Sequence, residues 1–211
     1  MTDLYKDLLI GVSGGVIGAV IGFLLSLWLV YYERKKKLKA LQEAFYREFR
    51  ILKLNLEGWL LNLDDEFKKT VTDTYSGLRE FDFRFLEALS IEIISSGGLL
   101  SQEQREFQTR IENKIEGIKV KEEKRDEDID KSNEAAFRIP RHHTSYLLCD
   151  VVEAIYFLNK FIDKKDAFLI SHNNASPTRQ AMIAYKLAGV EFELEIWESV
   201  LSFNPHLKNK E

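Results

Sequence analysis

The sequence predicts an all-α protein in which an N-terminal transmembrane helix continues into a cytoplasmic antiparallel helical bundle. Three observations support this fold class. Residues 8–32 contain no charged side chain, later segments repeat apolar residues at helical spacing, and no segment alternates apolar and polar residues strongly enough to anchor a sheet. The 211-residue chain also holds a single cysteine, Cys149, which excludes an intramolecular disulfide framework.

The N-terminal element is an uncharged run of 25 residues at positions 8–32. As a helix this run is about 37 Å long, enough to cross a hydrocarbon core of about 30 Å with some tilt. It is too long for the apolar part of a cleaved signal peptide, and no small-residue cleavage motif closes it. We therefore expect an uncleaved single-pass anchor, preceded by a short extracytoplasmic N-terminus at residues 1–7.

Basic residues follow the run at once, whereas only Lys6 precedes it. The cluster consists of Arg34, Lys35, Lys36, Lys37 and Lys39. The positive-inside rule places the N-terminus outside the cell inner (plasma) membrane and the large C-terminal part in the cytoplasm. The cluster is expected at the membrane surface, near anionic headgroups, and a simple stop-transfer role explains it better than specific lipid recognition.

Small residues recur every four positions inside the predicted span. They form two adjacent ridges, Gly11, Gly15 and Ala19 on one and Gly14, Gly18 and Gly22 on the other. Ridges of this glycine-zipper kind let two helix backbones approach closely in lipid, although glycine is also common in spans that do not associate. The pattern favours a homo-oligomer, and only several copies together could line a pore.

The next element is a basic stalk helix at residues 33–63. Apolar residues recur every three or four positions from Leu38 to Leu63. No proline or glycine lies between Tyr32 and Gly58, so the stalk should be continuous with the span. The stripe fits one wall of an intramolecular bundle, while an intermolecular coiled coil stays open.

A helical bundle is expected over residues 64–211. Helices are predicted at about 78–95, from Ser101 onward, at about 144–162, and from Pro177 as one helix through Leu201. Ser101 with Gln104 is a capping box, and Ser176 before Pro177 is a cap followed by proline at the first helical position. Residues 119–134 are dense in charges of both signs, which is typical of a solvated helix end or a connection.

Charge separates the two parts of the chain. The first 40 residues carry a net charge of +3 and the remainder −7. An acidic soluble region argues against non-specific binding of nucleic acid.

One polar loop is a candidate ligand site. His172, Asn173 and Asn174 precede a helix whose first turn carries Arg179, and a helix N-terminus can receive an anion. An ordinary capped turn explains the same residues. No catalytic signature is present, and the histidines and cysteine lack metal-site spacing, so we predict no catalytic residue, no metal and no cofactor.

Residues 19–56 read AVIGFLLSLWLVYYERKKKLKALQEAFYREFRILKLNL and join a glycine-rich span, a basic run and a helix. This stretch resembles uncharacterised prokaryotic single-pass membrane proteins, and FLEALSIEIISSGGLL at residues 85–100 is similar to a second helix of that group. The resemblance implies a bacterial or archaeal single-pass protein and assigns no functional residue.

The expected function is that of a membrane-anchored interaction or signal-sensing protein, which self-associates through its span and binds an unknown cytoplasmic protein or small ligand. The alternative is a ligand-triggered oligomeric effector or channel-like protein, for example in antiviral defence or stress response. A membrane-tethered enzyme using His142, His143 and Cys149 is a third hypothesis.

Overall fold

The fold is described from a computed structural model. It describes the backbone of residues 2–69, 75–133, 136–173 and 175–208, and the side chains of residues 18–69, 75–129, 138–171 and 175–207. Within these ranges the chain forms seven α-helices, two short 3-10 helices and one two-stranded hairpin. The all-α class is therefore confirmed, and the hairpin is an addition that the sequence did not predict.

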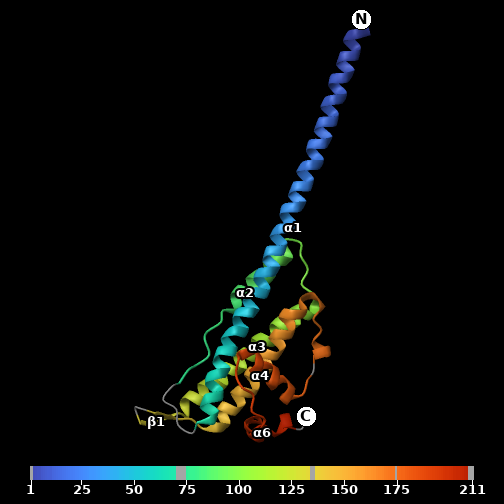
Figure 1. Ribbon diagram of the computed structural model, residues 1–211. Helices are drawn as coiled ribbons and strands as arrows, with labels where there is room; N and C mark the ends of the chain where they lie inside the picture. The colour runs from blue at the N-terminus through green and yellow to red at the C-terminus, as the bar shows by residue number, and fades with distance from the viewer. Residues whose placement is uncertain (1, 70–74, 134–135, 174, 209–211) are drawn as a thin grey trace.

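The first helix, α1 (Thr2–Lys68), runs without a break through the uncharged segment, the basic cluster and the stalk. Its N-terminal half projects from the body as a lone helix, and its C-terminal half lies within the bundle (Figure 1). The predicted stripe is confirmed, because Phe45, Phe49, Leu52, Leu56 and Leu63 are all buried. The helix ends five residues later than predicted, since Phe67 is buried as well and extends the packed face.

No helix is long and apolar enough to cross a membrane when only the residues with described side chains are considered. Positions 8–17 of the predicted span, with Gly11, Gly14 and Gly15 of the two ridges, lie outside those residues.

The core lies where α1 packs against α4 (Arg141–Lys164) and where α3 (Gln102–Glu127) packs against α4. At its centre the rings of Phe107 and Phe161 stack with centroids 4.2 Å apart, and Phe49 meets Phe161 edge-on at 4.9 Å. On α4, the helical spacing of five apolar residues predicts one buried face, and all five are buried: Leu147, Val151, Ile155, Leu158 and Ile162. These contacts tie the stalk directly to the middle of the bundle.

The second helix, α2 (Phe83–Ser95), starts later than the sequence predicted. Asp82 caps it by accepting a hydrogen bond from the backbone N–H of Arg84 at 3.0 Å, so the helix cannot begin at Leu78. The four-residue spacing of Phe81, Phe85, Leu89 and Ile93 predicts one buried face, but Phe85 is 51% exposed while Leu86, Leu89 and Ile93 are buried. Gly97, at φ 81°, ends the segment in the left-handed region that favours glycine.

The capping box at the start of α3 is confirmed. The Ser101 hydroxyl accepts from the Gln104 N–H at 3.1 Å, and the Gln104 side chain accepts from the Ser101 N–H at 2.7 Å. The charged segment 119–134 is helical as far as Glu127. Beyond it come β1 (Asp130–Asn133) and β2 (Ala136–Arg138), paired antiparallel with Asp130 opposite Arg138 and an irregular register toward the turn.

The C-terminal helix predicted to run through Leu201 is two helices, α5 (Pro177–Ala188) and α6 (Leu194–Ser202). The prediction was wrong because Gly189 adopts φ 71° and caps α5, where the Val190 N–H donates to the Tyr185 carbonyl at 3.0 Å. The Ser176 cap with Pro177 at the first position is confirmed. The remaining elements are η1 (Lys165–Ala167), η2 (Ile170–Asn173) and α7 (Pro205–Lys208).

Candidate functional site

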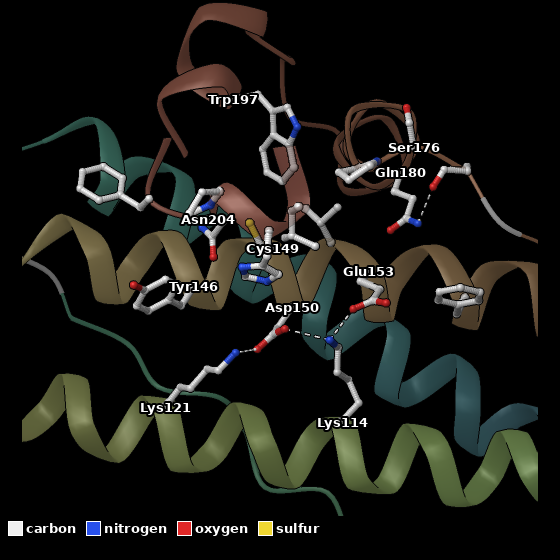
Figure 2. A pocket seen from close by; sticks show the side chains of 18 residues that line it. Lys114, Lys121, Tyr146, Cys149, Asp150, Glu153, Ser176, Gln180, Trp197 and Asn204 are labelled. Atoms are coloured by element: carbon white, nitrogen blue, oxygen red, sulfur yellow. Dashed lines mark hydrogen bonds and ion pairs between the residues drawn. The ribbon is translucent and has the colours of Figure 1, made fainter. Parts of the chain in front are cut away.

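A pocket of about 1170 Å³ opens beside α4. Side chains of α3 and α4 form one side of it, and residues of α5, α6 and α7 contribute the other (Figure 2). Because these five helices come from distant parts of the sequence, the pocket exists only in the folded bundle.

A network of ion pairs joins α3 to α4 along one wall of the pocket. Lys114 donates to Asp150 at 2.8 Å and also pairs with Glu153, while Lys121 pairs with the other oxygen of Asp150. Burial on its own would lower the pKa of Lys114. The negative charges of Asp150 and Glu153 together have a larger effect, so the pKa of Lys114 is raised above its ordinary value. Lys114 is therefore a charged anchor and not a neutral amine nucleophile.

Cys149 also lines the pocket, but its thiol is not activated. Burial, and secondarily the charge of Asp150, raises the pKa of Cys149 to about 12. A thiol nucleophile needs a depressed pKa, so the burial of Cys149 argues against the hypothesis of an enzyme that uses this thiol.

The rings of His142 and His143 lie side by side at the start of α4, with centroids 4.1 Å apart and planes tilted by 38°. His143 Nε2 lies 2.7 Å from Asp128 Oδ2. Among the residues whose side chains are described, no group of three histidine, cysteine or acidic side chains could hold a metal ion.

The opposite wall of the pocket is built by α5 and α6. Trp197 is 2% exposed, and its indole N–H has no hydrogen-bond partner among the described residues. The Gln180 amide donates to the Ala175 carbonyl at 2.9 Å, which folds that side chain back over the start of α5. Asn204 donates to Ser145 Oγ at 2.6 Å and so fixes α7 against α4. This wall therefore combines polar groups with an almost fully buried indole ring.

The predicted ligand loop lies next to the pocket without coinciding with it. Ser176, Pro177 and Gln180 line the pocket, whereas Arg179 is exposed and is not among the lining residues. Asn174 and the side chains of His172 and Asn173 lie outside the described residues.

The ion-pair wall between α3 and α4 is not among the features predicted from the sequence. The sequence does contain a signal for it. Lys114 and Lys121 are seven residues apart on α3, and Asp150 and Glu153 are three apart on α4, so each pair lies on one face of its helix.

The membrane-side candidates occupy one segment of α1. Gly18, Ala19 and Gly22 are exposed, and a Cβ added at Gly18 or Gly22 would meet nothing within 4 Å. In the basic cluster, Arg34 Nε donates to the Ser96 carbonyl at 2.9 Å, Lys37 pairs with Glu92 at 2.6 Å, and Lys39 lies 3.9 Å from Glu43. Lys35 and Lys36 are exposed.

The chain matches no protein-family model, no curated protein sequence and no solved structure.

Proposed function

We propose that the protein is a membrane-anchored, self-associating helical module whose bundle binds a protein partner or a small ligand in the cytoplasm. The observation that carries this proposal is the apolar projection of α1. Eleven large apolar side chains between Val20 and Tyr32 are 51–64% exposed, and the bundle covers none of them. A helix that is apolar all round is normally buried in a protein core or in lipid.

The free energy of burying apolar surface favours contact of this part of α1 with lipid or with another chain. Fully burying a large apolar side chain stabilises by about 1.5–3 kcal/mol relative to exposure. Eleven such side chains at half exposure therefore represent a driving force well above the free energy of a weak contact. Lipid around residues 8–32, together with a second copy of the helix, would bury these side chains. The basic residues that follow would then lie at the cytoplasmic boundary of the membrane.

The two ridges supply the contact between copies. Since nothing lies within 4 Å of a Cβ built at Gly18 or Gly22, the backbone at both glycines is open to another helix. Small residues in this arrangement allow the close packing that holds helices together in lipid.

We favour this function over a channel-like effector. Ser26 is the only serine in residues 18–32, and its hydroxyl donates to the Gly22 carbonyl of its own helix at 2.9 Å. The proton of that hydroxyl is thus engaged within the helix.

Self-association is tested by replacing the small residues in the full-length protein. Gly18→Ile and Gly22→Ile should lower the oligomer size measured by light scattering in mild detergent and by cross-linking in native membranes. Val20→Ile is the matched control, because Val20 is two positions from both glycines and so lies about 160° around the helix from each. An unchanged oligomer in the two glycine variants contradicts the proposed ridge contact.

Anchoring is tested separately, by alkaline carbonate extraction of membranes and by labelling single cysteines, introduced in a Cys149→Ala background, with a membrane-impermeant maleimide. Thr2→Cys should react from outside intact cells and Gln42→Cys only after lysis. Release of the protein by carbonate would refute the anchor, and reaction of Gln42→Cys from outside would refute the orientation.

A further inference from the structure

The C-terminal end of α2 lies beside α1 just after the uncharged run (Figure 1). Ser95 and Ser96 line a shallow depression together with Val30 and Arg34. The hydrogen bond from Arg34 to the Ser96 carbonyl and the ion pair of Lys37 with Glu92 hold the two helices together there.

These contacts fix the position of the C-terminal end of α2 along the axis of α1. Arg34 is two residues beyond Tyr32, or about 3 Å at the helical rise of 1.5 Å per residue. Val30, which shares the depression with Ser95 and Ser96, belongs to the uncharged run itself. If residues 8–32 cross a bilayer, the end of α2 therefore lies at the level of the cytoplasmic headgroups.

This segment presents apolar side chains outward. Leu99 is 88% exposed and Ile94 is 52% exposed. The backbone that carries Leu99 is held by close packing, because a Cβ added at Gly98 would collide with Leu38 and Ile93, and one added at Gly97 would collide with Arg34. Leu99 is consequently displayed by an ordered loop between two buried positions, Gly98 and Leu100.

We infer that residues 94–99, which we call the α2 tip, rest on the cytoplasmic leaflet and insert Ile94 and Leu99 into the headgroup region as a second membrane contact. This inference depends on the proposed anchor. A lipid surface fits the tip better than a protein partner, because the tip is continuous with the end of the span and lies beside the basic cluster. Within that cluster the exposed Lys35 and Lys36 attract anionic lipid by about 1 kcal/mol each. Glu92, the nearest paired acid, is neutralised by Lys37.

The consequence is a fixed orientation of the bundle. A single helix crossing a membrane leaves the attached domain free to tilt, whereas a second contact bound to α1 through Arg34 and Lys37 restricts that tilt. The pocket beside α4 is then held at a defined side of the bundle relative to the bilayer.

The test places one environment-sensitive fluorophore on the full-length protein in vesicles of phosphatidylcholine and phosphatidylglycerol that contain nitroxide-labelled lipids. Single cysteines are introduced in a Cys149→Ala background at Leu99, at Leu25 in the span, and at Met182 on α5. Met182 is 53% exposed, and α5 joins α1 at Asp64 through Tyr185, about 45 Å along the helix from Arg34, so it is the matched site away from lipid.

The Leu99 probe should be quenched several-fold more than the Met182 probe, and more strongly by a nitroxide near the headgroup than by one deep in the acyl chain, while the Leu25 probe shows the reverse depth order. Quenching at Leu25 with Leu99 as unquenched as Met182 overturns the α2 tip contact and leaves the anchor intact. Absence of quenching at Leu25 overturns the anchor, and the inference with it. Ile94→Cys repeats the measurement should Leu99→Cys disturb the loop.

Discussion

Arg125 offers the sharpest test of how the bundle is held together. Its side chain is fully buried near the end of α3, and it donates to Glu66 Oε2 at 3.2 Å, to Tyr75 Oη at 2.9 Å and to the Ser76 carbonyl at 3.2 Å. The guanidinium also lies 4.6 Å from the centre of the Tyr75 ring. One cation therefore joins α1, the segment that follows it, and α3.

Replacing this cation by a neutral side chain of similar length leaves a buried acid without its partner. Removing one member of a buried ion pair costs about 3–5 kcal/mol, and we expect Arg125→Met to destabilise the bundle by that amount at pH 8. Glu66 keeps only its hydrogen bond from Thr144, at 2.6 Å, in the variant.

The loss should shrink as the pH falls. Burial raises the pKa of Glu66 above its ordinary value, and the Arg125 charge is the largest influence that lowers it again. Without Arg125 this folded-state pKa rises further. A carboxyl whose pKa is higher in the folded than in the unfolded state binds more protons when folded, so stability falls as the pH rises from the unfolded pKa through the folded one. Protonation of Glu66 and of Glu122, whose pKa burial also raises, should therefore restore part of the stability near pH 5.

The assay is urea unfolding of the full chain in mild detergent, followed by tryptophan fluorescence. Trp59 is a local reporter, since its indole N–H donates to the same Ser76 carbonyl at 3.0 Å. With a denaturant slope of about 2 kcal/mol per molar, the midpoint should fall by about 1.5–2.5 M.

Arg110→Met is the matched control, because its ion pair with Glu106 is on the surface of the same helix and is worth at most about 1 kcal/mol. A loss below about 1 kcal/mol for Arg125→Met, or the same loss at pH 5 and pH 8, would refute the reasoning.

Further predictions concern packing, backbone and thiol chemistry. Phe161→Ala should cost about 3–5 kcal/mol in the same unfolding assay, because it removes the ring at the centre of the aromatic core; a cost near that of a surface substitution would contradict the packing. Gly117→Ala should stabilise α3 by up to about 1 kcal/mol, while Gly189→Ala should destabilise by about 1 kcal/mol because of its positive φ, although both sites have open space; equal effects would argue against the left-handed cap. Cys149 should resist iodoacetamide at pH 8 until urea unfolds the chain, as mass spectrometry would show, and modification of the folded protein would contradict a pKa of about 12.

The parts of the fold that sequence reasoning predicted correctly depend on local interactions. The stripe that contains Phe45, Phe49 and Leu52 recurs at the period of a helix face, and the face it defines is the one that is buried. The capping box of Ser101 and Gln104 is equally local, since both hydrogen bonds join residues three apart. Such features depend little on what the rest of the chain does.

The break between α5 and α6 was missed because two effects compete at one residue. Leu187, Val190, Leu194 and Trp197 continue a helical spacing, and that spacing predicts a single helix. Gly189 can adopt the left-handed conformation at no steric cost, and the Schellman-type bond from Val190 to Tyr185 repays the lost helical pairing. The break turns Trp197 toward the pocket wall. The predicted face is therefore buried only in part: Trp197 and Leu201 are buried, whereas Leu187 is 38% exposed and Leu194 is 52% exposed.

The buried cation could not be predicted from composition. Arg125 is one of many charges in residues 119–134, and such density normally indicates a solvated surface. What distinguishes Arg125 from its neighbours is a partner 59 positions away, Glu66, together with the rings of Trp59 and Tyr75. The ion-pair wall of the pocket is hidden in the same way, because pairing between α3 and α4 appears only when the two helices are packed.

The position of α4 links the pocket to the proposed membrane segment. Asp150 and Glu153 on α4 face the pocket, while Phe161, two turns later, packs against Phe49 of α1, and Lys53 of α1 donates to Asn159 at 3.4 Å. Close-packed interiors transmit displacement because side chains have no free volume to absorb it. A ligand that separates Lys114 from Asp150 is therefore expected to displace α4 against α1, and α1, unbroken from Lys68 to Thr2, links that displacement to the α2 tip and to the glycine ridges at which we propose that copies associate.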